Sequence, residues 1–185
     1  NGSRAWLVRG PPGAGVVVIC HGRSRSKAWS LPFIRVLGKD HSVLTFDFPG
    51  HGECPYGHIG AGLGEADVVD EALELVRSRG FDRVLLYGCS LGGAAALISQ
   101  GRCQHPLVRG VMTDGTFAAW RDIVDNKVGK FTPGYLRSAV LRVFGWITGH
   151  DIRAANPIDY VRNIKVPVHF VHGTADKLVP CSAAR

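Results

Sequence analysis

The strongest constraint on the fold is a set of short, mostly apolar runs that alternate with helical stretches. The runs are rich in β-branched and large apolar residues, as in strands that helices cover on both faces. They lie at Val16–Ile19, Val43–Phe46, Val84–Tyr87, Val108–Met112 and Val168–Val171. This alternation is typical of an α/β protein with a mostly parallel sheet and helices on both faces. At 185 residues the sequence is long enough for one such domain.

Two helices and one longer insertion connect the predicted strands. Residues 65–79 carry apolar side chains at three- and four-residue steps, and residues 91–99 form a second helix rich in small side chains. The stretch at about 117–160 is too long for a simple crossover helix. We therefore interpret residues 1–185 as a single core domain with a small helical cap at about 117–160. The alternative is that this insertion only runs over the surface and forms no cap.

Basic residues outnumber acidic ones by 22 to 15, for a formal net charge of +7. They are scattered along the chain, and their densest group is Arg23, Arg25 and Lys27 in one loop. This distribution favours an ordinary solvated surface, so no nucleic-acid partner is predicted. Anionic substrates or a membrane surface are the alternative explanations of the charge.

The five cysteines form no close pair, which argues against a disulfide framework and a zinc site. Their pattern favours a reducing compartment, and a cytoplasmic location is predicted. No apolar run reaches about eighteen residues, so no membrane span is expected, and no secretory signal is visible. Because the chain begins with Asn1 rather than Met, a signal or anchor ahead of it stays open.

The segment Gly88-Cys89-Ser90-Leu91-Gly92 matches the G-x-S-x-G pattern of a nucleophilic serine. It lies between a predicted strand and a predicted helix, where a sharp turn exposes the hydroxyl and the helix directs free N–H groups at the reacting centre. A structural Gly-Ser turn is the alternative. A phosphate-binding loop is not indicated because no G-K-[ST] follows. A dinucleotide-binding turn is not indicated because neither glycine-rich stretch follows a strand.

Three further motifs accompany this turn in a fixed order. Residues 19–23 (Ile-Cys-His-Gly-Arg) end the first predicted strand, residues 46–52 (Phe-Asp-Phe-Pro-Gly-His-Gly) end the second, and residues 171–176 (Val-His-Gly-Thr-Ala-Asp) end the last. Together the four motifs resemble those of the α/β-hydrolase family along essentially the whole chain. The most similar branch is that of the serine-aminopeptidase-like enzymes and small esterases.

The resemblance implies a catalytic site at the carboxyl ends of the strands. In it, Ser90 is the nucleophile, and Asp176 is the triad acid that orients a histidine and stabilises its charged form. Two alternatives stay open for the acid. Asp176 could serve only to cap a turn, and Asp114, which follows the preceding strand, is the reserve candidate.

The resemblance also implies an oxyanion hole made by two backbone N–H groups, those of Arg23 and Leu91. His21 and His51 are expected to brace the neighbouring loops by hydrogen bonds rather than to transfer protons. No metal and no organic cofactor are implied.

The sequence departs from the family pattern at its end. The family places the catalytic histidine after the acid, beyond one more helix and strand. Nine residues follow Asp176, and none of them is histidine. The favoured explanation is a chain truncated before the catalytic histidine, with the last strand and helix missing. The alternative is a natural short form in which a displaced histidine such as His21 or His172 serves, or in which activity is lost.

These observations predict a serine hydrolase that cleaves an ester, thioester or amide bond of a small acyl or peptide-like substrate through an acyl-enzyme on Ser90. A non-catalytic binding protein on the same fold and an acyltransferase are the alternatives. Aromatic residues of the insertion are expected to line an apolar acyl pocket or to form the cap's own core; they are Trp120, Phe131, Phe144 and Trp146.

Overall fold

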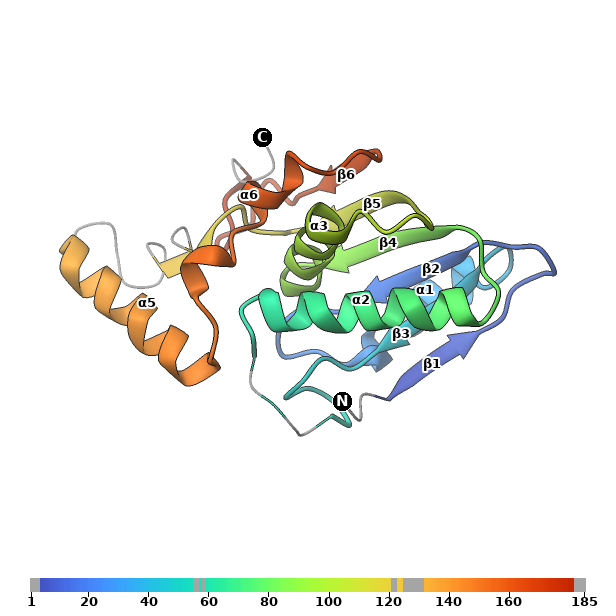
Figure 1. Ribbon diagram of the computed structural model, residues 1–185, viewed down its shortest axis with the longest axis horizontal. Coiled ribbons are helices and arrows are strands. Elements are labelled where there is room, and N and C mark those ends of the chain that lie inside the picture. The colour runs from blue at the N-terminus through green and yellow to red at the C-terminus, as the bar shows by residue number, and fades with distance from the viewer. Residues whose placement is uncertain (1–3, 55–56, 58, 121–122, 125–131, 182–185) are drawn as a thin grey trace.

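The fold is built on one six-stranded sheet with strand order β1-β3-β2-β4-β5-β6 (Figure 1). The computed structural model describes residues 4–54, 57, 59–120, 123–124 and 132–181. The strands are β1 (Ala5–Val8), β2 (Val16–Cys20), β3 (Ser42–Phe46), β4 (Val84–Cys89), β5 (Val108–Asp114) and β6 (Val168–Val171). Strand β1 pairs antiparallel with β3, and every other neighbouring pair is parallel. The predicted mostly parallel α/β sheet is confirmed.

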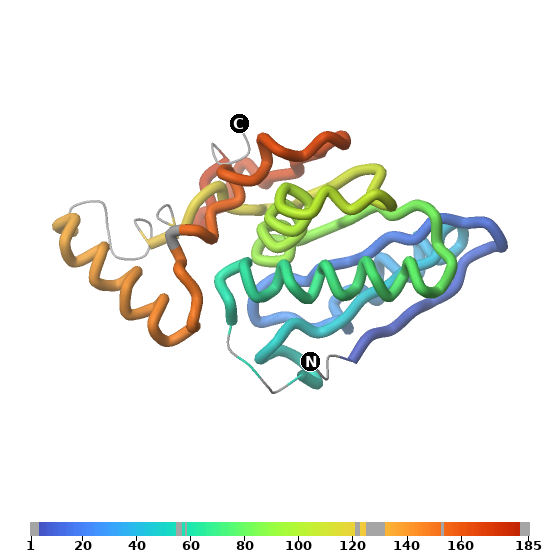
Figure 2. The backbone as a smooth tube through the Cα atoms, in the orientation of Figure 1, coloured from blue at the N-terminus to red at the C-terminus, as the bar shows by residue number. Residues whose placement is uncertain are grey.

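Helices cover both faces of the sheet, as predicted. Helices α2 (Leu63–Ser78), α3 (Leu91–Cys103) and α6 (Pro157–Val161) lie on one face, where α2 and α3 run side by side (Figure 2). The short helices η1 (Lys27–Ser30) and α1 (Leu31–Leu37) lie on the other. Helix α3 extends four residues beyond the predicted end at Ser99.

The two faces are buried to different extents. Under α2 and α3 lies the main core, where Val18, Leu44 and Leu86 are fully buried. On the other face, Trp29 and Phe33 pack beside Tyr87. Next to α1 this face keeps an apolar hollow of about 490 Å³, lined by Val17, Pro32, Phe33, Val36, Leu37, His41, Leu85, Tyr87 and Met112.

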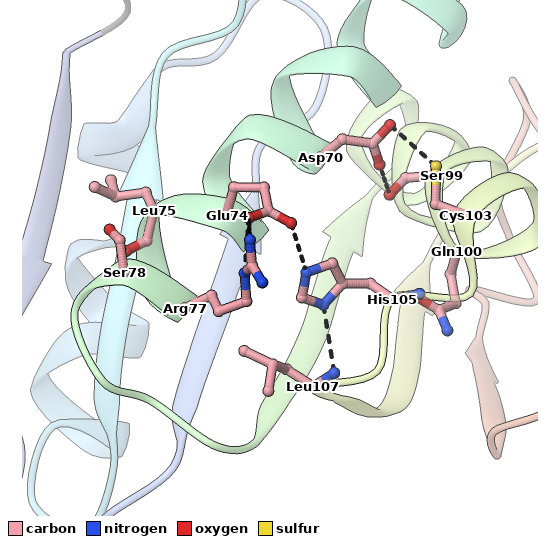
Figure 3. A network of polar contacts seen from close by, with 10 residues as sticks. All are labelled: Asp70, Glu74, Leu75, Arg77, Ser78, Ser99, Gln100, Cys103, His105 and Leu107. Carbon is pink, nitrogen blue, oxygen red and sulfur yellow. Dashed lines mark hydrogen bonds and ion pairs between the residues drawn. The ribbon is translucent and has the colours of Figure 1, made fainter.

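A polar network joins α2 to α3 and to the loop that follows it (Figure 3). The Ser99 hydroxyl donates to Asp70 Oδ1 at 2.6 Å. Glu74 accepts hydrogen bonds from Arg77 at 2.8 Å and from His105 Nε2 at 3.3 Å. His105 Nδ1 accepts the Leu107 N–H, which fixes the loop that leads into β5.

The insertion after β5 contains short helices, of which α5 (Gly134–Thr148) stands off one end of the sheet and η2 (Ile152–Ala154) follows it (Figure 1). The Trp120 ring lies 5.5 Å from Phe144, and both belong to a second apolar cluster that includes Leu91. Trp146 is 86% exposed and belongs to no buried cluster. Phe131 lies outside the described residues.

Candidate active site

The chain turns sharply between β4 and α3, and Ser90 occupies the turn. Its backbone has φ 49° and ψ −113°, a conformation that costs energy for a residue with a side chain. The Ser90 N–H donates to the Asp114 carbonyl at 2.8 Å, and the Ser90 carbonyl accepts the Ala94 N–H at 3.0 Å. Neighbouring backbone thus holds the strained turn in place, with Ser90 half-buried at the carboxyl end of β4.

Close backbone contacts explain the glycines of this turn. A Cβ on Gly88 would overlap the Gly92 carbonyl, and a Cβ on Gly92 would overlap the Cys20 carbonyl at the end of β2. Only residues without a side chain allow α3 to approach both β4 and β2 so closely.

The turn after β2 lies directly against Ser90. An ideal Cβ on Gly22 would lie 3.5 Å from the Ser90 Cβ. The Arg25 N–H donates to the Gly22 carbonyl at 3.2 Å, and Ser24 adopts a positive φ of 59°. Within the described part of the chain, no backbone hydrogen bond is donated by the N–H of Arg23 or Leu91. Arg23 follows the end of β2, and Leu91 follows Ser90 as the first residue of α3.

His21 is fully buried behind this turn and uses both ring nitrogens. Its Nδ1–H donates to the Gly22 carbonyl at 2.9 Å, and its Nε2 accepts the Phe48 N–H at 3.1 Å. Burial lowers the pKa of His21, in keeping with the neutral tautomer that these bonds require. His51 donates from Nδ1 to the Pro49 carbonyl at 2.9 Å. The His21 bonds therefore join the turn after β2 to the loop after β3, whereas the His51 bond lies within the loop after β3.

Lys27 corrects one expectation. The sequence groups it with Arg23 and Arg25 as a basic surface patch, but its side chain is buried. Its Nζ lies 2.5 Å from Asp47 Oδ2 and 2.5 Å from Glu53 Oε2, and its N–H donates to Asp47 Oδ1 at 2.7 Å. The patch is reduced to Arg23 and Arg25, which are exposed.

The charges of this cluster stabilise one another. Burial alone would lower the pKa of Lys27, but the hydrogen bonds with Asp47 and Glu53 raise it above its ordinary value. Burial likewise opposes ionisation of Asp47, yet Lys27 and two backbone N–H groups lower the pKa of that carboxyl. The cluster ties the turn after β2 to the loop after β3, so both loops have one position relative to Ser90.

Asp176 lies in the loop after β6, at the same edge of the sheet as Ser90. Its Oδ1 accepts the N–H groups of Leu178 at 2.8 Å and Val179 at 3.0 Å. Its Oδ2 lies 3.7 Å from His172 Nε2, which itself donates to the Val179 carbonyl at 2.8 Å. Oδ1 therefore caps the turn. Oδ2 accepts no hydrogen bond from the described residues, so turn capping leaves it available to a further donor.

Asp114, the reserve acid, lies at the end of β5. Burial and the nearby Asp114 carboxylate together raise the pKa of Tyr87 to about 12. Burial and the same carboxylate raise the pKa of the Cys89 thiol. Asp114 thus interacts with groups on the α1 side of the sheet.

The described residues around Ser90 include neither a histidine that is hydrogen-bonded to it nor a metal site. No hydrogen bond joins a histidine to Ser90 among them. Nor do three or more histidine, cysteine or acidic side chains converge as a metal site in the described ranges.

Comparison with known proteins decides the family. The model of the alpha/beta hydrolase family matches residues 17–180, which include the turns that carry Ser90 and Asp176. The chain belongs to the alpha/beta hydrolase family. This α/β hydrolase is 27% identical over 169 residues to the uncharacterized protein YfhR of Escherichia coli K12. The alignment covers 89% of this chain and 53% of YfhR. It is 24% identical over 176 residues to the uncharacterized protein YqkD of Bacillus subtilis, with 90% and 57% covered. The chain thus spans about half the length of the curated relatives it matches.

Solved structures share the fold of this α/β hydrolase. The esterase Pf2001 of Pyrococcus furiosus aligns with a TM-score of 0.73 at 20% identity, over 97% of this chain and 69% of the esterase. A monoacylglycerol lipase of Paleococcus ferrophilus aligns with a TM-score of 0.67 at 23% identity, over the whole chain and 82% of the lipase.

Proposed function

We propose that this α/β hydrolase is a serine hydrolase that cleaves an ester, thioester or amide of a small acyl or peptide-like substrate. The observation that carries the proposal is the strained backbone of Ser90, set against the Gly22–Arg23 turn. Strain of this kind is retained where the surrounding structure over-determines it, as at active sites. The esterase and lipase neighbours support a hydrolase of acyl bonds.

In the proposed reaction, Ser90 Oγ attacks the substrate carbonyl carbon while its proton passes to a general base. The carbonyl oxygen becomes an oxyanion that accepts the Arg23 and Leu91 N–H groups. The tetrahedral intermediate collapses, and the alcohol, thiol or amine leaves with the proton from the base. Water then attacks the carbonyl carbon of the acyl-enzyme while its proton passes to the base. The second tetrahedral intermediate collapses, the acid leaves, and Ser90 Oγ takes the proton back from the base. In the family pattern the base is a histidine that the acid orients, a role for which Asp176 Oδ2 is available.

The insertion at about 117–160 is proposed to act as the cap. Support comes from the cluster in which Trp120 and Phe117 pack with Leu91, the residue after the nucleophile. Trp120 Nε1 also donates to the Ala61 carbonyl at 2.6 Å, so the insertion is anchored beside the start of α2. A reducing, cytoplasmic setting is proposed from the five free cysteines.

Labelling with a fluorophosphonate probe tests the proposal, using protein expressed from the complete coding sequence. The probe is expected to label the wild type and to leave Ser90→Ala unlabelled. Ser78→Ala, which removes an exposed hydroxyl on α2, is the matched control and should label like the wild type. Absence of wild-type labelling, or equal labelling of Ser90→Ala, would refute the proposal of an enzyme and favour a non-catalytic binding protein on the same fold.

A further inference from the structure

Helix α5 carries a continuous apolar stripe on its exposed side. Starting at Leu136, the stripe recurs at four- and three-residue steps, which place its members on one helix face. Trp146 at 86% and Tyr135 at 73% exposure lie at its two ends. The exposed apolar residues of α5 are Tyr135, Leu136, Val140, Val143, Trp146 and Ile147. Contiguous exposed apolar surface of this kind marks an interaction site.

The stripe does not line the candidate active site. The opposite side of α5 carries Leu141 and Phe144, which pack into the cluster around Trp120. Because those residues face the domain, the stripe faces away from it. Figure 1 shows α5 standing off the end of the sheet, apart from the other labelled helices. Among the described residues, no other element covers the stripe, so it is available to a partner.

Charge and residue type indicate the chemistry of that partner. Residues 132–150 contain Arg137 and Arg142 and no acidic residue, in a chain with a net charge of +7. Arg142 is exposed. Aromatic rings at the ends of an apolar helix face, together with basic side chains on the helix, are features of helices that lie in a lipid interface. One acidic residue, Asp151, follows the helix and lines a hollow with Arg142 and Trp146.

We propose that α5 docks the protein on an anionic lipid surface, with the stripe in the acyl–headgroup boundary and Arg142 at the phosphates. The helix lies in the surface rather than across it, since its 15 residues span about 22 Å against a hydrocarbon core of about 30 Å. Within the described residues, no helix is long and apolar enough to cross a membrane.

The size of the stripe disfavours a second copy of the chain as the occupant. The face of a 15-residue helix is about 22 Å long and about 10 Å wide. A stable protein interface buries roughly 800 Å² on each partner, several times that face. A bilayer has no such requirement, because apolar side chains and basic groups contribute to binding individually.

Cosedimentation with phospholipid vesicles tests the proposal. Vesicles that contain roughly one-third phosphatidylglycerol in phosphatidylcholine should bind the protein, pure phosphatidylcholine should bind it more weakly, and high salt should release it. Val143→Glu should lower the partition coefficient by about tenfold or more. Val36→Glu makes the same change at an exposed valine on α1, and it should bind like the wild type. Circular dichroism of both variants confirms that each is folded.

Two outcomes would overturn the proposal. One is equal vesicle binding by Val143→Glu and Val36→Glu, which would locate the lipid contact elsewhere. The other is a dimer in analytical ultracentrifugation that Val143→Glu dissociates, without vesicle binding by the wild type. That result would assign the stripe to a second copy. Neither outcome depends on catalysis, so the test is independent of Ser90 labelling.

Discussion

The loops around Ser90 and the loop of Asp176 lie at one edge of the same sheet but are held in different ways. The first group, residues 20–27, 47–53 and 88–93, forms the interlocked loops, joined by the bonds of His21 and by the buried Lys27–Asp47 pair. The loop of residues 172–179, the acid loop, follows an edge strand. The Asp176 side chain is 30% exposed there, and buried Val179 anchors the loop to the rest of the domain.

The difference matches what each group has to do in the proposed reaction. Oxyanion stabilisation depends on donors that are fixed before the substrate arrives, so the turns of Arg23 and Leu91 need a rigid setting. Asp176 is proposed to act through a histidine, so its loop needs only to hold Oδ2 in the direction of that side chain. Substitutions in the interlocked loops should therefore lower stability most. Substitutions of the acid should lower activity with little change in stability.

Removal of the Asp47 carboxylate is expected to have the largest effect on stability. Asp47→Ala leaves Lys27 charged, buried and without its main partner, which should cost about 3–5 kcal/mol in the free energy of unfolding. Asp176→Ala loses two hydrogen bonds at a partly exposed site and should cost about 1 kcal/mol. Urea denaturation measures both. The double variant Lys27→Met/Asp47→Leu should recover only the part of the loss that comes from the unpaired lysine, because the Lys27 and Glu53 N–H groups still lose their acceptor. Equal losses for the two single variants would refute the comparison.

Two glycine substitutions sharpen the same contrast. A methyl group on Gly92 would overlap the Cys20 carbonyl and lie 2.6 Å from the His21 carbonyl oxygen. Gly92→Ala should therefore destabilise the protein by about 3 kcal/mol, since the packed backbone must shift. Gly173 in the acid loop has open space around it, and Gly173→Ala should change stability by less than about 0.5 kcal/mol. A Gly92→Ala variant as stable as the wild type would show that the turn adapts.

The sheet and the Ser90 turn were predictable because local pattern determines them. Continuous β-branched runs identify strands that are buried on both faces, and the glycines of G-x-S-x-G reflect close backbone approach within a few residues. Strand β1 was missed because four residues with mostly exposed side chains carry no comparable signal. Its place depends on pairing with β3.

The role of Lys27 could not be predicted from its neighbourhood. It follows Arg23 and Arg25 in a polar loop, a composition typical of solvent exposure. Its partners Asp47 and Glu53 lie 20 and 26 residues further along the chain and reach it only through the tertiary fold. The Asp47-x-Pro-Gly-His-Gly pattern located the loop but not the cation that its carboxylate binds.

Acid titration gives a smaller effect on stability. Because Lys27 and the backbone donors outweigh the effect of burial, the pKa of folded Asp47 lies below its unfolded value. Its contribution is present above the unfolded pKa and is lost as pH falls through the folded one. Stability should fall from about pH 5 downward, by at most about 1.4 kcal/mol per pH unit for this carboxyl. Lys27→Met/Asp47→Leu should fall less steeply in urea titrations at each pH, and identical slopes would assign the acid sensitivity to other groups.

Asp176→Asn should change stability least and the proposed activity most. The amide oxygen of asparagine can still accept the Leu178 and Val179 N–H groups, so the free energy of unfolding should stay within about 0.5 kcal/mol. The charge at Oδ2 is lost, and with it the support for a charged histidine, so ester hydrolysis should fall by about 10⁴. Asp114→Asn is the matched control at the neighbouring strand end and should retain activity. If Asp114→Asn were inactive while Asp176→Asn stayed active, with the fluorophosphonate still bound to Ser90, the acid would belong to β5. The acid loop would then serve only as a turn.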